Sequence, residues 1–123
     1  MASEVTTAAG GVSNPRNAVR SNHQIRVFQI DSRQSNESRF AKFMPYGDLK
    51  EYGLKFEPSR YKPVFSGEME VRDLDDVYSQ LQGKKPEGYS GHSLSVSDVV
   101  VMDGKAYYVD DYGFKKVNKK GFK

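Results

Sequence analysis

The sequence predicts an α+β domain, in which a small antiparallel sheet is packed by two short helices. The main observation is a β-rich stretch over residues 98–117, interrupted by two tight turns at Asp103-Gly104 and at Asp111-Tyr112-Gly113. Such spacing is typical of a three-stranded antiparallel meander. Upstream lie one or two further β-rich segments and two segments with helical periodicity. The 123 residues are enough for one domain of this kind.

The first strand is expected at residues 25–30, which are rich in β-branched and aromatic residues and are bounded by a polar run. A polar loop follows over residues 32–38, and residues 40–44 are predicted to form a short extended piece. A helix is predicted over residues 45–52, because Pro45 suits a first helical position and Gly53 a C-terminal cap.

A second strand is predicted over residues 61–69, and Pro63 favours a place at the edge of the sheet because it has no N–H to donate. The next helix is predicted to begin after Asp73, a good N-cap. Its core-facing stripe, at helical spacing, comprises Leu74, Val77, Tyr78 and Leu81.

The two ends of the chain differ in composition from this body. Residues 1–24 are rich in small and polar residues and are predicted to be a disordered tail, because they offer little apolar surface to bury. The domain is expected over residues 25–119, and residues 120–123 form a basic C-terminal end. Cysteine is absent, no apolar run approaches the roughly 20 residues that span a bilayer, and no secretory signal is evident. We therefore expect a cytoplasmic protein with no membrane contact.

Catalytic chemistry is weakly indicated. Residues 91–98 contain one histidine, three serines and an aspartate, the residue types of a hydrolytic triad, with His92 at the centre. However, triad members usually come from separate elements, and no exposed-nucleophile turn is present. We interpret the segment as a polar loop entering a strand, and we expect no catalytic residue, no metal site and no cofactor.

Binding is better indicated than catalysis. The chain has eight tyrosines and a dense acidic stretch around the predicted second helix, and tyrosine is enriched at protein interfaces. Adjacent residues of a strand face opposite sides, so Tyr107 and Tyr108 cannot both be in the core. The candidate protein-binding residues are Tyr107, Tyr108, Tyr112, Tyr89, His92, Asp75 and Asp76.

Nucleic-acid binding is the alternative. Residues 113–123 contain five lysines and no acidic residue, and a basic segment beside aromatic side chains suits single-stranded nucleic acid. The candidate residues for this alternative are Lys84, Lys85, Lys115, Lys116, Lys119 and Lys120.

Several blocks in order also resemble a known family. They are Arg39-Phe40-x-x-Phe43-Met44-Pro45-Tyr46, Tyr61-x-x-Val64-Phe65-x-Gly67, Leu74-x-x-Val77-Tyr78, the run from Gly91 to Val101, and Ala106-Tyr107-Tyr108-Val109-Asp110-x-x-Gly113-Phe114. Over about residues 25–118 the chain resembles the YodL-like domain, although its Asp103-Gly104 turn is shorter than that family's expected polar loop.

The resemblance implies a setting rather than an activity. Similar domains occur in multi-module proteins of phages, plasmids and conjugative elements, and no catalytic activity is established for them. It implies a non-enzymatic accessory protein of a mobile element that binds a host or element protein. A counter-defence role, inhibiting a host nuclease system such as CRISPR-Cas, is the specific function we expect.

Overall fold

The computed structural model describes residues 19–122 and contains one five-stranded antiparallel sheet, with the strand order β3-β2-β4-β5-β6. The strands are β2 (Ser21–Ile30), β3 (Tyr61–Val71), β4 (Val99–Met102), β5 (Lys105–Val109) and β6 (Phe114–Val117). The helices are α1 (Asn36–Ala41), α2 (Tyr46–Glu51) and α3 (Leu74–Gln80), and a 3-10 turn, η1 (Pro58–Arg60), precedes β3. The predicted α+β class, the C-terminal meander and both N-terminal strands are confirmed.

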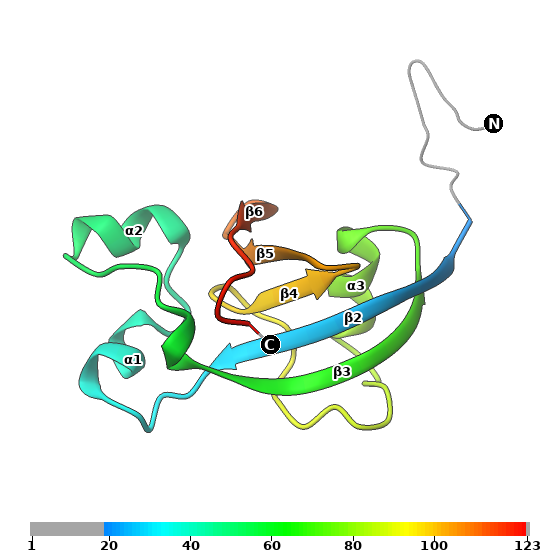
Figure 1. Cartoon of the computed structure of the whole chain (residues 1–123), viewed down its shortest axis with the longest axis horizontal. Coiled ribbons are helices and arrows are strands. Elements are labelled where there is room, and N and C mark those ends of the chain that lie inside the picture. Colours follow the sequence, from blue (N-terminus) through cyan, green and yellow to red (C-terminus); the bar gives the residue numbers. More distant parts are fainter. Residues whose placement is uncertain (1–18, 123) are drawn as a thin grey trace, which may run out of the picture.

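The two long strands form one half of the sheet and the short meander the other half (Figure 1). β3 is the edge strand, as Pro63 predicts, and its pairing with β2 shifts register between Val27 and Phe28. At this bulge Val64 and Phe65 are consecutive residues that are both buried, whereas in regular pleating they would face opposite sides.

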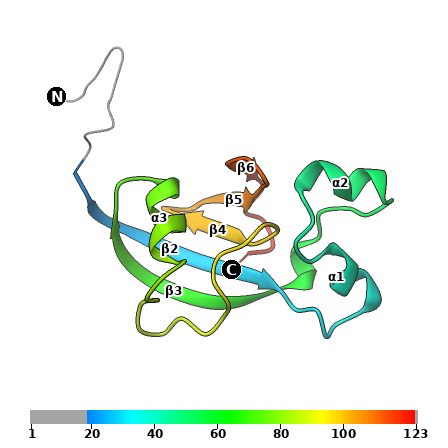
Figure 2. The same cartoon turned by 180° about the vertical axis from the view of Figure 1, so that it is seen from behind.

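Both faces of the sheet carry a core. On one face Ile25, Val27 and Val100 pack with Val77 and Leu81 of α3. Figure 2 shows α3 lying across this face and the helices α1 and α2 standing beyond one end of the sheet. On the other face Phe28, Val99 and Tyr108 pack with Leu49 of α2 and with Phe122. The helix predicted over residues 45–52 is confirmed as α2, and the helix predicted after Asp73 is confirmed as α3.

The expectation of an extended piece over residues 40–44 was wrong in its first part. Residues up to Ala41 belong to a third helix, α1, within the expected polar loop. The hydroxyl of Ser35 accepts a hydrogen bond from the backbone N–H of Ser38 and caps this helix at its start. Only Ser38 and Ala41 are buried on α1, so its sequence shows almost no amphipathic stripe.

The expected boundary of the N-terminal tail was also too late. Ser21 to Gln24 extend β2 and pair with Glu68 to Val71 of β3. His23, which we placed in the tail, lies opposite Met69, and its Nδ1 is 2.5 Å from Oδ2 of Asp103. Residues 1–18, the rest of the predicted tail, lie outside the described residues.

The basic C-terminal end is not simply a solvated extension. After β6 the chain runs back in front of the sheet in Figure 1. Phe122 is buried, with its ring 5.0 Å from that of Phe28 and 5.3 Å from that of Tyr61. Arg26 adds a hydrogen bond of 3.3 Å from its guanidinium to the Phe122 carbonyl. This aromatic contact fixes residues 118–122 across the second face.

Candidate partner-binding surface

The clearest surface feature that combines charge with exposed aromatic residues is a hollow between α3 and the β5–β6 turn. It has a volume of about 240 Å³. Its lining is apolar at Val96, Val109 and Phe114, and acidic at Asp75, Asp110 and Asp111, with Tyr78 and Gly113 completing it. We call these eight residues the acidic hollow, and none of them is basic.

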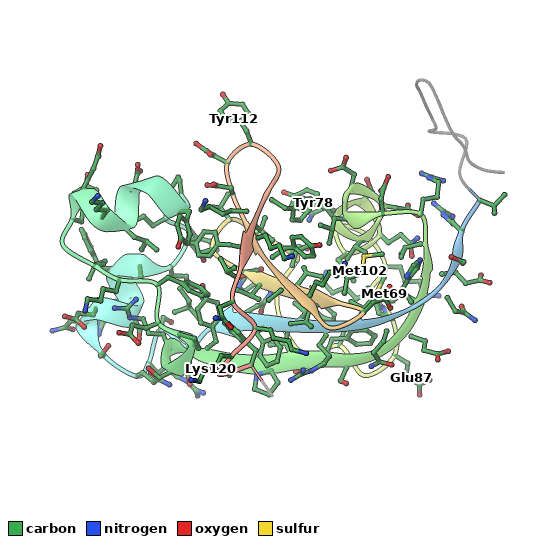
Figure 3. The ribbon with its side chains drawn as sticks, turned by 45° about the horizontal axis from the view of Figure 1, so that its top comes forward. Met69, Tyr78, Glu87, Met102, Tyr112 and Lys120 are labelled. Carbon is green, nitrogen blue, oxygen red and sulfur yellow. The ribbon has the colours of Figure 1, made fainter. Side chains whose placement is uncertain are left out.

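Two tyrosines border the acidic hollow. Tyr78 on α3 has 37 % of its surface exposed, and Tyr112 at the tip of the β5–β6 turn has 92 %. Figure 3 shows Tyr112 pointing away from the body of the domain. The turn holds this shape because Asp110 Oδ1 accepts hydrogen bonds from the backbone N–H of Asp111 and of Tyr46, 3.0 and 3.1 Å long.

This arrangement is chemically suited to a basic side chain. A lysine or arginine carries an apolar stem below a charged head, so the stem can cover an apolar floor while the head meets an acidic rim. An aromatic ring at the rim adds a cation–π contact. The acidic hollow therefore offers a place for Lys or Arg of a partner protein.

The structure brings together only part of the predicted binding set. Asp75 and Tyr112 are exposed at or beside the acidic hollow, whereas Asp76 is buried. Asp76 accepts two hydrogen bonds from the guanidinium of Arg20 and one from the backbone N–H of Arg72. The Arg20 bond, more than any other contact, lowers the pKa of this carboxyl. Asp76 is therefore held inside the fold by these contacts, whereas its neighbour Asp75 is exposed.

The two strand tyrosines separate as alternation predicts. Tyr108 is buried, and its hydroxyl donates a 2.5 Å hydrogen bond to the carbonyl of Met44. Burial raises the pKa of Tyr108 far above its usual value. Tyr107 points to the opposite face and is only half-buried. Tyr108 is therefore wrong as a surface contact, and it acts instead as a link between β5 and the segment before α2.

The remaining candidates, Tyr89 and His92, belong to a polar network around Gln29. The Gln29 amide donates to the His92 carbonyl at 2.9 Å and to Asp98 Oδ2 at 3.0 Å, and its oxygen accepts from the His92 N–H at 3.2 Å. The Tyr89 hydroxyl donates to the same carbonyl at 2.7 Å. A side chain at Gly91 would collide with Gln29 Oε1, so the chain needs glycine there.

The histidine and two of the serines of the Gly91–Asp98 segment bond to backbone groups. His92 Nδ1 lies 2.7 Å from the Ser93 carbonyl, which fixes the proton on Nδ1, and Nε2 is buried with no hydrogen-bond partner among the described residues. The Ser95 hydroxyl donates to the Ser93 carbonyl, and the Ser97 hydroxyl accepts from the backbone N–H of Phe43. No serine hydroxyl pairs with His92 in these contacts, which agrees with our interpretation of the segment as a polar loop.

Sequence reasoning missed two groups of residues. One is Gln29, a polar residue that alternation places on the same face of β2 as the buried Ile25 and Val27. That position could have identified it as a buried polar residue. The other is an exposed aromatic pair formed by Phe40 of α1 and Tyr52, which directly follows α2. Their rings meet edge to face, with centres 5.4 Å apart. Phe40 is part of the first block of the family resemblance, but nothing in that block shows that its ring is exposed and meets Tyr52.

The lysines of the alternative prediction do not gather on one surface. Lys84 and Lys85 line a separate hollow together with Glu68 and Glu87. Lys115 and Lys116 are consecutive on β6 and face opposite sides of the sheet, and the Lys115 ammonium lies 5.2 Å from the ring centre of Tyr46. In Figure 3 Lys120 lies at the end of the domain opposite Tyr112.

Within residues 19–122, no group of three or more acidic or histidine side chains is placed to hold a metal ion. The same residues contain no helix with the length and apolar character needed to cross a bilayer.

Comparison with known proteins supports the family that the sequence resembles. The family model of the YodL-like domain matches residues 24–119, which cover most of β2, the whole of β3, all three helices and the meander. Neither the curated proteins nor the solved structures include a match to the chain. Because the family model covers well over half of the sequence, the chain belongs to the YodL-like domain family.

Proposed function

We propose that this YodL-like domain is a non-enzymatic protein-interaction module that binds a basic surface of a partner protein through the acidic hollow and Tyr112. The observation that carries the proposal is the convergence of Asp75 from α3 with Asp110 and Asp111 from the β5–β6 turn around an apolar floor. Exposed acids that stand alone carry little information, whereas these three surround one apolar floor and have a 92 % exposed tyrosine, a residue type enriched at interfaces, beside them.

The family setting suggests which partner to test first. A host defence nuclease such as a CRISPR effector carries basic channels for nucleic acid, and an acidic surface is complementary to such a channel. A small accessory protein of a mobile element that occupies the channel would inhibit the nuclease. The role in a mobile element follows from the family resemblance, and the complementarity of charge favours a nuclease as the partner.

The non-enzymatic part of the proposal is supported by the contacts of the Gly91–Asp98 segment. The hydroxyls of Ser95 and Ser97 and the Nδ1 atom of His92 are bonded to backbone groups, and Asp98 is buried against Gln29. The nucleic-acid alternative is less well supported, because its lysines are distributed over several separate places and some lie beside glutamates.

Affinity capture of the tagged protein from nuclease-treated host lysate, with mass spectrometry, tests the proposal. The variant Asp75→Lys/Asp111→Lys reverses the charge of the hollow, and Glu51→Lys on α2 is a matched control because Glu51 is also an exposed acid. We expect a stoichiometric protein partner that the double variant loses and the control retains. Capture of nucleic acid alone, or a partner that the double variant still binds, would overturn it.

A further inference from the structure

A second hollow, of about 360 Å³, lies where β2 ends and β3 begins. It is lined by the last residues of β2, by the turn that follows, by Lys62 of β3 and by Gly91 and His92. In Figure 2 the loop that follows α3 passes close to α1 at this end of the sheet. This hollow is distinct from the acidic hollow, with which it shares no residue.

The charge of this second hollow is the reverse of the first. Arg33, Lys42 and Lys62 line it against a single acid, Asp31. Arg33 already pairs with Asp31, since its Nε lies 3.1 Å from Oδ1, and this contact lowers the pKa of the carboxyl. Lys42 and Lys62 form no ion pair with any acid of residues 19–122. The hollow therefore presents two ammonium groups that are not held in ion pairs, beside polar backbone and serine hydroxyls. Lys62 acts on Asp31 only from a longer distance, as a minor cause of the lowered pKa of that carboxyl.

An exposed aromatic ring stands next to these cations. Phe43 has 53 % of its surface exposed. The centre of its ring lies 5.6 Å from the ring centre of His92 and 5.2 Å from the ammonium of Lys42. The backbone of Phe43 has φ +70°, a conformation that is strained for a bulky residue. Its N–H donates a 2.9 Å hydrogen bond to the hydroxyl of Ser97, which itself has φ +86°.

This strained pair fixes the ring where it is. Backbone strain in folded proteins is concentrated at ligand-binding and active sites, where the surrounding structure maintains it. Here two strained residues from different segments, Phe43 and the buried Ser97, are hydrogen-bonded to each other. The contact holds the Phe43 ring beside Lys42 and His92, which line the hollow.

We propose that this hollow binds the phosphate of a nucleotide, with Lys42 and Lys62 contacting the phosphate and the base stacking on Phe43. Ammonium groups bind phosphate oxygens through charge-assisted hydrogen bonds, and exposed aromatic rings stack on nucleobases. The ligand is either a free nucleotide or the terminal nucleotide of a single strand, since both present the same phosphate and base. The volume is in the range of small-ligand sites, which begin at about 300 Å³.

Isothermal titration calorimetry of the full chain with ATP, with a ten-nucleotide oligothymidine and with inorganic phosphate tests this assignment. We expect ATP or the oligonucleotide to bind at low salt, and Lys42→Ala/Lys62→Ala to weaken binding by at least about fivefold. The control Lys50→Ala/Lys55→Ala removes two exposed lysines that line neither hollow, and it leaves affinity unchanged. Binding of ATP identifies a free nucleotide, and binding of the oligonucleotide alone identifies a strand end.

The variant Phe43→Leu separates the base from the phosphate. It retains an apolar side chain but removes the stacking ring, so ATP affinity falls severalfold while phosphate affinity is unchanged. Thermal unfolding of each variant confirms that it is folded. No binding of either nucleotide ligand at millimolar concentration, or loss of binding in the Lys50/Lys55 control instead, would overturn the site. Equal affinity of Phe43→Leu and the parent chain for ATP would overturn the stacking role.

Discussion

The side-chain amide of Gln29 donates a 3.0 Å hydrogen bond to Oδ2 of Asp98, and both residues have only 1 % of their surface exposed. The contact joins the end of β2 to the residue before β4, 69 positions later in the chain. Ser95 donates its backbone N–H to the same carboxylate oxygen at 2.8 Å. The Gly91–Asp98 segment is therefore built around one strand glutamine.

Replacing Gln29 with leucine should destabilise the domain strongly. Leucine cannot donate to Asp98 or to the His92 carbonyl, and it cannot accept from the His92 N–H. Each buried group left without a partner in this way costs about 1–3 kcal/mol. We expect the free energy of unfolding in urea to fall by about 3 kcal/mol.

The matched control is Gln24→Leu, an exposed position on the same strand. Its free energy of unfolding should change by no more than about 0.5 kcal/mol. If Gln29→Leu and Gln24→Leu unfold at the same urea concentration, the network does not stabilise the fold.

The carboxyl of Asp98 should make stability depend on pH near neutrality. Burial raises its pKa from the ordinary 3.8 to about 7, against the opposing effect of the Ser95 and Gln29 hydrogen bonds. Between these two values the folded carboxyl retains a proton that the unfolded one has lost. The folded state then binds more protons, so stability falls as pH rises through this window and levels off above it.

The effect is measurable by urea unfolding at several pH values between 4.5 and 8. One such group contributes a slope of up to about 1.4 kcal/mol per pH unit. Asp98→Asn retains an oxygen for the Gln29 and Ser95 donors but cannot ionise, so it should remove this slope. A parent chain and an Asn variant with parallel pH profiles would show that Asp98 ionises normally.

The C-terminal aromatic residue should contribute more to stability than its lysine-rich surroundings suggest. Phe122 is 4 % exposed and packs against Phe28, Phe56 and Tyr61. Phe122→Ala is expected to lower the free energy of unfolding by about 3 kcal/mol, as for other buried phenylalanines. Lys120→Ala, two residues away and exposed, is the control and should have almost no effect.

This prediction also affects how the basic end is tested. Deleting residues 119–123 to remove charge would also remove Phe122 from the second core, so lost binding would not identify the lysines. If the deletion and Lys120→Ala are equally stable, the aromatic contact is unimportant.

The sequence predicted the regular elements because local rules determine them. Asp73 caps α3 in the structure as expected, with its carboxylate accepting from the N–H of Asp76 at 2.9 Å. The Asp103-Gly104 turn has positive φ at both residues, +51° and +84°, as a two-residue hairpin turn requires. These features depend on residues close together in sequence.

What the sequence did not predict depends on distant partners. The burial of Phe122 requires the chain to run back across a sheet whose strands come from both halves of the molecule. The role of Gln29 depends on a segment more than 60 residues away. The acidic hollow was predicted only as separate acids and tyrosines, because nothing local places Asp75 beside Asp111.

The adjacent acids Asp75 and Asp76 should separate binding from stability. Asp75 is exposed and lines the acidic hollow, whereas Asp76 is buried and holds Arg20 and the N–H of Arg72. Asp75→Asn should leave the free energy of unfolding within about 0.5 kcal/mol of the parent. Asp76→Asn should lower it by roughly 2 kcal/mol, because a charged hydrogen-bond acceptor is lost from a buried place.

Acid adds a second test of Asp76. Its contacts lower its pKa below the ordinary 3.8, so the unfolded carboxyl takes up a proton at a higher pH than the folded one. The stability it supplies is complete above pH 4 and is lost as pH falls through the folded pKa. The difference between the parent and Asp76→Asn in urea unfolding should therefore shrink below pH 4. Two outcomes would mean that Asp76 does not act through its charge. One is an equal loss of stability in Asp75→Asn and Asp76→Asn at pH 7. The other is a difference between the parent and Asp76→Asn that stays the same below pH 4.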